Sequence, residues 1–264
     1  MKPVAFHYER PESVGEAVAL LAEHGDEAKV LAGGQSLVPV LNMRVLRPSV
    51  LVDINRVHNL DNVVLENGGL RVGALVRQAD ARLGEVPILR ECLPHVGHFV
   101  TRNRGTVCGS VAHADAAAEL PLALALVGGS VVAESARGRR EIAADDFFVT
   151  HFTTELTPDE LVVATVWPVA DGGWGYAFEE LTQRHGDFAL CMAGAAARGS
   201  ELRVVLGAVV DRPTVLAVDP AAPGESAAEQ VEPFGNLHAS AGYLRNLVRV
   251  LVDRVVTRAR ERAS

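Results

Sequence analysis

The chain has 264 residues, of which 48% are hydrophobic and 22% are charged, and its formal net charge is −8. It is long enough to bury a substantial core, in one large domain or in two to three small ones, and its composition is that of an ordinary globular protein. The acidic balance argues against a nucleic-acid-binding surface, because phosphate recognition needs clustered Lys and Arg.

The amino terminus and the cysteines exclude further classes. Residues 1–11 lack the apolar segment of a secretion signal, and no later apolar run reaches the roughly 18 to 20 residues of a membrane-spanning helix. We therefore expect a cytoplasmic protein without a membrane span. Cys92, Cys108 and Cys191 are widely separated, with no CxxC pair and no histidine at metal-ligand spacing. They predict no disulfide, no zinc site and no iron–sulfur cluster in this chain.

The first region, residues 1–57, has the pattern of a small α/β lobe. Apolar residues recur at helical spacing in its first helix: Val14, Ala17, Val18 and Leu21. Ser13 is suited to cap this helix and Gly25 to end it. The segments AKVLAGG and VLVDI then indicate two buried strands, separated by an apolar stretch with helical potential.

The second region, residues 58–169, carries hairpin patterns in which two short runs flank a turn. The turns are Asn67-Gly68-Gly69 and Arg137-Gly138. Helical stretches around residues 88–97 and 116–126 lie between these hairpins. This second lobe is therefore expected to combine an antiparallel sheet with helices.

The third region, residues 170–264, opens with three strand patterns: WGYAFEEL, DFALCMAGAAAR and ELRVVLGAVV. It closes with a long helix from about Ala239 to Arg262, whose apolar stripe is typical of core or subunit contact. The segment Pro213–Phe234 is rich in Pro, Ala and Glu, and we interpret it as a loop. The whole chain is thus expected to be α+β.

A first candidate site is the loop Ala32-Gly33-Gly34-Gln35-Ser36, which follows a strand. Backbone N–H groups converge on an anion in such an arrangement. Glycine matters there because a Cβ would hold a phosphate away and would disfavour positive φ angles. Taken alone, such a loop is more often a plain tight turn, and it is neither a GxGxxG fingerprint nor a P-loop.

A second candidate is the segment TRNRGTVCGS, residues 101–110, followed by VAHADAAAELP. Its small and hydroxyl-bearing residues suit a loop whose backbone contacts a ligand, and Asp115 or Glu119 could accept hydrogen bonds from ribose or ribityl hydroxyls. A polar connection before an ordinary helix is the alternative. Cys108 could be a reactive thiol, but a small packing residue is the favoured interpretation.

A third cluster, Gln183-Arg184-His185-Gly186-Asp187-Phe188, joins two predicted strands, where a solvated hairpin turn is the simpler interpretation. The remaining histidines lack a partner at meaningful spacing. Neither a Ser-His-Asp set nor a Cys-His set can be ordered from the sequence, so no catalytic residue is assigned.

In this order, the segments resemble the FAD-binding (medium) subunit of molybdenum hydroxylases, the family of aerobic carbon monoxide dehydrogenase and the flavin domain of xanthine dehydrogenase. The motifs are FHYERP, LAGGQSLVPVLNMRVLRPSVLVDI, RNRGTVCGSVAHADAAAELP, PDELVVATVWP and RHGDFAL, which together cover nearly the whole chain. Two separated glycine loops in the right context are far more specific than either loop alone.

The resemblance implies an FAD-binding fold of the vanillyl-alcohol-oxidase type, with FAD between the first two lobes and a third, shortened lobe over part of the flavin. It implies that FAD is contacted by two loops and three further residues: Val30, Leu31, Ala32, Gly33, Gly34, Gln35, Ser36 and Leu37; Thr106, Val107, Cys108, Gly109 and Ser110; Asp115, Glu119 and Val162. The two loops would hold the pyrophosphate, and the turn at residues 184–188 would lie near the flavin ring.

The resemblance also implies a role in electron transfer. FAD would collect electrons from an iron–sulfur subunit and a molybdenum-cofactor subunit and pass them to an external acceptor. The chain lacks cluster cysteines and is too short for molybdenum domains, so it would need both partners. It departs from the family at Cys108, where glycine is usual, and at Ala116, where proline is usual. A stand-alone FAD-dependent oxidase or dehydrogenase acting on a small organic substrate, or a binding protein that has lost FAD, are the alternatives.

Overall fold

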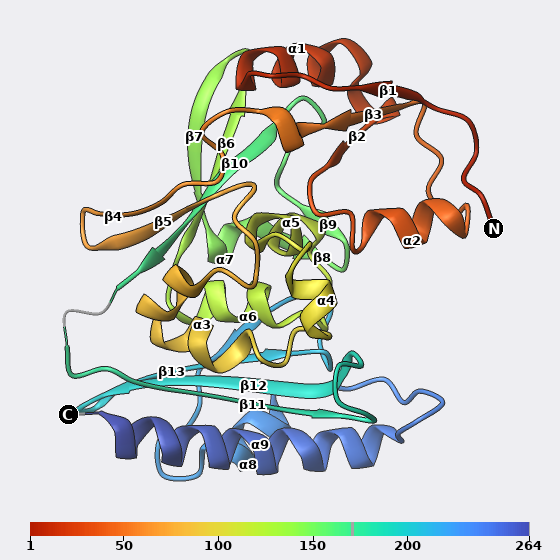
Figure 1. Cartoon of the computed structure of the whole chain (residues 1–264). Coiled ribbons are helices and arrows are strands. Elements are labelled where there is room, and N and C mark those ends of the chain that lie inside the picture. Colours follow the sequence, from red (N-terminus) through yellow and green to blue (C-terminus); the bar gives the residue numbers. More distant parts are fainter. Residues whose placement is uncertain (170–171, 264) are drawn as a thin grey trace.

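The computed structural model describes residues 1–169 and 172–263. Three sheets follow one another along the molecule, each built from a continuous part of the chain (Figure 1). A small sheet with α1 and α2 lies at one end, a larger sheet lies in the middle, and a third sheet lies on the long helix α9 at the other end. The structure is α+β, as the sequence predicts.

The first sheet is parallel, and its strands stand in the order β1 (His7–Glu9), β3 (Val50–Asp53) and β2 (Ala28–Leu31). The helix α1 (Val14–His24) begins and ends where expected, because the Ser13 hydroxyl accepts a hydrogen bond from the backbone of Glu16 and Gly25 has a φ of 49°. Two short 3-10 turns, at Gly25–Glu27 and Ile54–Arg56, follow α1 and β3. The strand β1 is an addition to the predicted elements.

The middle sheet is antiparallel, in the order β4 (Val63–Glu66), β5 (Gly69–Gly73), β10 (Leu161–Pro168), β6 (Ser130–Ser135) and β7 (Gly138–Ala143). Both predicted hairpins are present. The late strand β10 lies between them and joins them into one sheet. A two-stranded ribbon, β8 (Phe148–Thr150) with β9 (Thr153–Thr154), lies beside it.

The helices of this middle region are short. A 3-10 turn at Ala81–Glu85 and the helices α3 (Pro87–Cys92), α4 (Phe99–Arg102), α5 (Val107–His113) and α6 (Glu119–Leu126) lie between the two hairpins, and α7 (Ala144–Phe147) follows the second one. The predicted stretch at residues 88–97 stays helical only to Cys92, because Pro94 and the positive φ of Gly97 interrupt it. Every residue of α6 is buried, since this helix lies between the middle and third sheets.

The third sheet is antiparallel, in the order β11 (Gly175–Thr182), β12 (Ala189–Arg198), β13 (Glu201–Gly207) and β14 (Thr214–Leu216). The helix α9 (Ala241–Arg262) covers one face, and α3 and α6 lie toward the other (Figure 1). The loop interpretation of residues 213–234 is wrong: the segment contains β14 and α8 (Pro223–Glu229). Pro223 starts α8, and Gly224 lets it approach the Asp253 side chain of α9, which accepts a 2.8 Å hydrogen bond from the Gly224 N–H.

Apolar side chains form two cores. One is shared by the first two sheets, by α1, α3, α5 and α6, and by one face of the third sheet, and the other fills the space between the third sheet and α9. We keep residues 1–57, 58–169 and 170–264 as a proposed division into lobes, since each sheet falls within one of these ranges. None of the helices in residues 1–169 and 172–263 combines the length and the apolar surface that crossing a bilayer requires.

Candidate functional site

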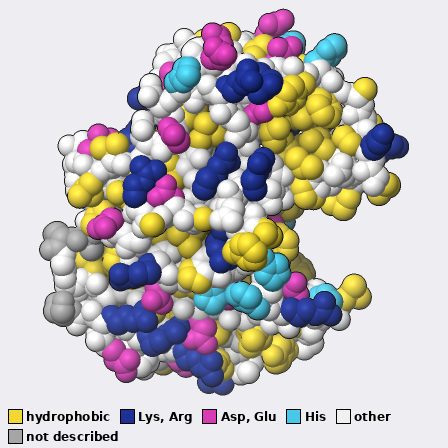
Figure 2. Space-filling view, viewed as in Figure 1, with side chains coloured by type: hydrophobic (Ala, Val, Ile, Leu, Met, Phe, Trp, Pro, Cys, Tyr) yellow, Lys and Arg dark blue, Asp and Glu magenta, His cyan; other side chains and the backbone are white. Residues whose placement is uncertain are grey.

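A deep hollow opens between the part of the molecule that carries α2 and the part built on β11 and β12 (Figure 2). Lys and Arg side chains lie above this hollow, and His side chains lie along its lower wall. Both glycine loops belong to elements at the hollow, because residues 32–36 lead from β2 into α2 and residues 103–106 lead from α4 into α5.

The two glycine loops contact each other through Gly33. A Cβ on Gly33 would lie 2.9 Å from the Cα of Gly105 and still closer to the carbonyl oxygen of Arg104. No side chain fits at this distance without displacing backbone, so glycine is required at position 33 by close approach rather than by its φ angle. The structure therefore brings together two loops that are about 70 residues apart in the sequence.

The first loop presents unpaired backbone donors. Within residues 1–169 and 172–263, no acceptor is bound by the N–H groups of Gly33, Gly34, Gln35 or Ser36. Gly34 has a φ of 73°, and the helix α2 (Leu37–Asn42) begins directly after Ser36. Consecutive free N–H groups before a helix make a site for an anion.

The second loop ends in a capped helix. The Thr106 hydroxyl accepts a 3.1 Å hydrogen bond from the N–H of Gly109, and a Cβ on Gly109 would lie 2.5 Å from that hydroxyl. Glycine at position 109 thus leaves room for the N-cap of α5. The N–H of Val107 binds the carbonyl of Val76, whereas the N–H of Cys108 has no acceptor among the described residues.

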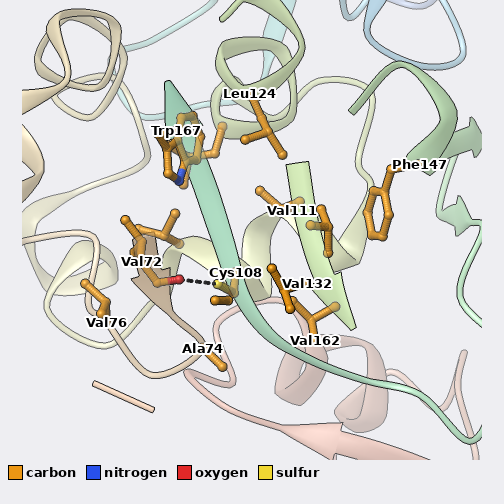
Figure 3. Close-up of a cluster of buried hydrophobic side chains, with 14 of the residues drawn as sticks. Val72, Ala74, Val76, Cys108, Val111, Leu124, Val132, Phe147, Val162 and Trp167 are labelled. Atoms are coloured by element: carbon orange, nitrogen blue, oxygen red, sulfur yellow. Dashed lines mark hydrogen bonds between the residues drawn. The ribbon is translucent and has the colours of Figure 1, made fainter. Parts of the chain in front are cut away.

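The Cys108 side chain points away from the loop surface. It is buried among Val72, Val111 and Val162, and its thiol donates a 3.3 Å hydrogen bond to the carbonyl of Val72 (Figure 3). Burial raises the pKa of this thiol to about 12. A thiol with such a pKa stays protonated and is a poor nucleophile at neutral pH, so the structure favours the packing role.

The two acidic candidates occupy different settings. The Asp115 carboxylate accepts a 2.9 Å hydrogen bond from the N–H of Ala117 and orders the turn between α5 and α6. Glu119, the first residue of α6, is only 8% exposed, and burial raises its pKa to about 7, with a further contribution from the Glu180 carboxylate. His95, 3.1 Å from Glu180, belongs to the same group.

The turn at residues 183–188 docks against the segment that leads to the second loop. Gly186 has a φ of 85°, and a Cβ there would lie 2.7 Å from the ring of His98. The rings of His98 and His185 are 6.0 Å apart, centroid to centroid. His98 precedes α4, so the third lobe contacts the second lobe directly beside the loop at residues 103–106.

Two residues that sequence reasoning missed connect the glycine loops through hydrogen bonds to their backbone carbonyls. The Asn55 amide donates a 2.9 Å hydrogen bond to the carbonyl of Ala32, and Arg77 donates one of 2.7 Å to the carbonyl of Arg104. Asn55 had a signal, because it follows the carboxyl end of β3, beside the strand that leads into the first loop. Arg77 lies in an irregular segment and had none.

The comparisons with known proteins agree with one another. The family described as FAD binding domain in molybdopterin dehydrogenase matches residues 4–170. The chain is 39% identical to the 6-hydroxypseudooxynicotine dehydrogenase complex subunit alpha of Paenarthrobacter nicotinovorans, a match that covers 100% of the chain and 97% of that relative. It is 35% identical to the nicotine 6-hydroxylase medium subunit of the same organism, covering 98% and 99%. The solved carbon monoxide dehydrogenase of Hydrogenophaga pseudoflava matches with a TM-score of 0.95 and 31% identity, covering 100% of both chains.

Proposed function

The chain belongs to the family of FAD-binding domains in molybdopterin dehydrogenases and is the FAD-dependent medium subunit of a molybdenum hydroxylase, and from this premise we propose that it holds the FAD pyrophosphate where its two glycine loops meet. The loops concerned are residues 30–37 and 106–110. Two relatives are named as subunits, one as the alpha subunit of a dehydrogenase complex and one as the medium subunit of a hydroxylase.

The contact between Gly33 and the second loop is the observation that carries this proposal. It leaves the free N–H groups of Gly33, Gly34, Gln35 and Ser36 beside the amino end of α5. A pyrophosphate needs several convergent donors and close backbone approach, and these residues fit both needs. The side chain of Cys108 creates no obstacle, because it is turned into the core while its N–H stays available.

The remaining assignments are proposals of the same kind. Glu119 suits the ribityl or ribose hydroxyls, since its buried carboxyl accepts no hydrogen bond from another side chain within residues 1–169 and 172–263 and a carboxyl can accept several. Asp115 lies in the same turn. Val162 is retained as an apolar contact, although its burial beside Cys108 favours a supporting position beneath the site (Figure 3). The turn at residues 184–188 is proposed to lie near the flavin ring.

FAD, when bound, supplies the chemistry, because it accepts electrons singly or in pairs. The chain's own residues bind the cofactor, orient it and set its electrostatic environment. We propose that an iron–sulfur subunit and a molybdenum-cofactor subunit deliver the electrons and that a small external acceptor removes them. That relatives are named as subunits of complexes favours this role over a stand-alone oxidase. The cytoplasmic location stays a prediction.

Substitution of Gly33 tests the proposed pyrophosphate site. We expect purified Gly33→Leu protein to lack the visible flavin absorbance of the wild type, even after addition of FAD, because the side chain would displace the second loop. Gly84→Leu is the matched control, since a Cβ on Gly84 meets nothing within 4 Å. Circular dichroism checks that both variants fold. Undiminished FAD affinity in a folded Gly33→Leu protein would show that the loops are misassigned.

A further inference from the structure

A chain of polar contacts runs behind the two glycine loops. It starts in β1, where the Tyr8 hydroxyl donates to the carboxylate of Asp53. Asp53 accepts hydrogen bonds from Asn55, at 2.9 Å from the backbone N–H and at 2.6 Å from the side-chain amide. The side chain of Asn55 is thereby held in one orientation, with its amide oxygen free to accept from Arg77.

Arg77 and Asn55 together form a bridge between the loops. The Arg77 guanidinium donates from Nη2 to Oδ1 of Asn55, at 2.8 Å, and from Nη1 to the carbonyl of Arg104, at 2.7 Å. The Asn55 amide donates to the carbonyl of Ala32, at 2.9 Å. The carbonyls of Ala32 and Arg104, one from each loop, are therefore held by a single pair of side chains. Asn55 and Arg77 are 22 positions apart in the sequence.

This bridge also orients the free donors. In a trans peptide the carbonyl and the following N–H point in opposite directions. The Ala32 carbonyl points back to Asn55, so the N–H of Gly33 points to the other side of the loop, where no described residue accepts it. A fixed carbonyl thus fixes the direction of the donor proposed to bind pyrophosphate.

Arg77 brings a positive charge that forms no direct ion pair within the described part of the chain, and the carboxylate of Asp53 reaches it only through Asn55. Its guanidinium donates to a backbone carbonyl and to an amide oxygen. Burial lowers the pKa of Arg77, and the neighbouring Arg104 guanidinium lowers it further. The side chain of Arg104 is exposed and has no hydrogen-bond partner among residues 1–169 and 172–263. Two neighbouring cations that make no direct ion pair are suited to an anionic ligand.

We propose that Arg77 is the positioning residue of the pyrophosphate site: through Asn55 it fixes the distance between the two glycine loops, and from the carbonyl side of these loops its charge favours an anion at their free N–H groups. This inference rests on the proposed function. It adds two residues, Asn55 and Arg77, to the binding machinery, and it explains how loops from two lobes keep a common orientation before the cofactor arrives.

Titration of the FAD-free full chain with FAD, followed by flavin fluorescence, tests the bridge. Removing a hydrogen-bonded charge typically weakens binding at least about tenfold, and we expect this for Arg77→Met and a smaller loss for Asn55→Ala. Arg77→Lys keeps the charge but cannot reach two acceptors in a fork, so it should recover only part of the affinity. Arg82→Met is the matched control, because Arg82 binds Asp80 and the carbonyl of Asp61 and contacts neither loop.

Competition by ADP, which carries the diphosphate without the flavin, gives a second readout. Arg77→Met should weaken ADP binding by about the same factor as it weakens FAD binding, because the bridge acts on the diphosphate that both ligands share. Equal FAD affinity in wild type, Arg77→Met and Arg77→Lys would overturn the inference while leaving the proposed function intact. Failure of the wild type itself to bind FAD would instead remove the proposed function. If Arg77→Met does not fold, the comparison of Arg77→Lys with wild type decides, and wild-type affinity there counts against the bridge.

Discussion

The Sγ atom of Cys108 lies 3.3 Å from the carbonyl oxygen of Val72, to which the thiol donates, and this contact directs the side chain into the core beneath α5 (Figure 3). Position 108, where the resemblance described above leads us to expect glycine, therefore carries a side chain that does not block the surface of the loop. In the first turn of α5, the backbone N–H groups face the surface of the loop and the Cys108 side chain faces the core. Only the backbone is proposed to contact FAD.

Cys108→Gly should cost stability and leave FAD binding nearly unchanged. The substitution removes a buried side chain and a hydrogen bond and places glycine in a helix, which together amount to roughly 2 kcal/mol of unfolding free energy. Urea unfolding measures that cost, and FAD titration measures the affinity. Cys191→Ala, at a buried position in β12, is a control for losing a thiol elsewhere. A Cys108→Gly protein that is as stable as wild type but binds FAD more weakly would contradict this packing role.

Gly186→Ala should destabilise the chain by more than φ strain alone. Gly186 and Gly199 both have positive φ, at 85° and 56°, and each alanine there costs about 1 kcal/mol from the backbone. Only Gly186 also meets a neighbour, since its Cβ would lie 2.7 Å from the His98 ring, whereas nothing lies within 4 Å at Gly199. We therefore expect Gly186→Ala to lower the unfolding free energy more than Gly199→Ala does.

A double-mutant cycle separates the two costs at Gly186. In a His98→Ala background, Gly186→Ala should cost no more than Gly199→Ala, because the ring that it would strike is gone. An unchanged excess in that background would mean that the turn does not dock on His98. If the turn also lies near the flavin ring, as proposed, Gly186→Ala should change the flavin fluorescence of the FAD-loaded protein.

The elements that the sequence predicted correctly are those whose signals are local. Ser13 and Gly25 mark the two ends of α1, because a helix cap acts within about three residues. Asn67-Gly68-Gly69 predicts a hairpin for the same reason, since a tight turn also depends on a few neighbouring residues. The segment at residues 213–234 failed for the opposite reason. Its helix α8 is short and is stabilised by the contact between Gly224 and Asp253 of α9, which composition does not reveal.

The candidate site was likewise predictable only where its signals are local. Each glycine loop was visible as a loop, but local sequence contains nothing that says Gly33 contacts the backbone of Arg104 and Gly105. The resemblance to a family supplied that pairing. The bridge through Arg77 escaped both approaches, because it depends on the tertiary distance between Asn55 and Arg104 rather than on a motif.

Glu119 makes the stability of the FAD-free protein depend on pH. Burial raises its pKa from 4.5 to about 7, so the folded state holds a proton that the unfolded state releases between these values. Stability from this group is complete below about pH 4.5 and is lost as pH rises through 7, by roughly 3 kcal/mol. His95 acts in the same direction, since hydrogen bonding to Glu180 raises its pKa, and its contribution is lost as pH rises above 6.5.

Glu119→Gln isolates the carboxyl's part of this dependence. The amide keeps the shape of the side chain and cannot ionise, so urea unfolding between pH 5 and pH 8 should give a flatter profile than wild type, with the variant at least as stable at pH 8. His95→Gln should remove only the smaller part of the pH dependence, at pH values above 6.5, because Glu119 still ionises in that variant. A Glu119→Gln protein with the full wild-type slope would show that the Glu119 carboxyl is ionised between pH 5 and pH 8 in the folded protein. That result would contradict the raised pKa of Glu119 on which this prediction rests.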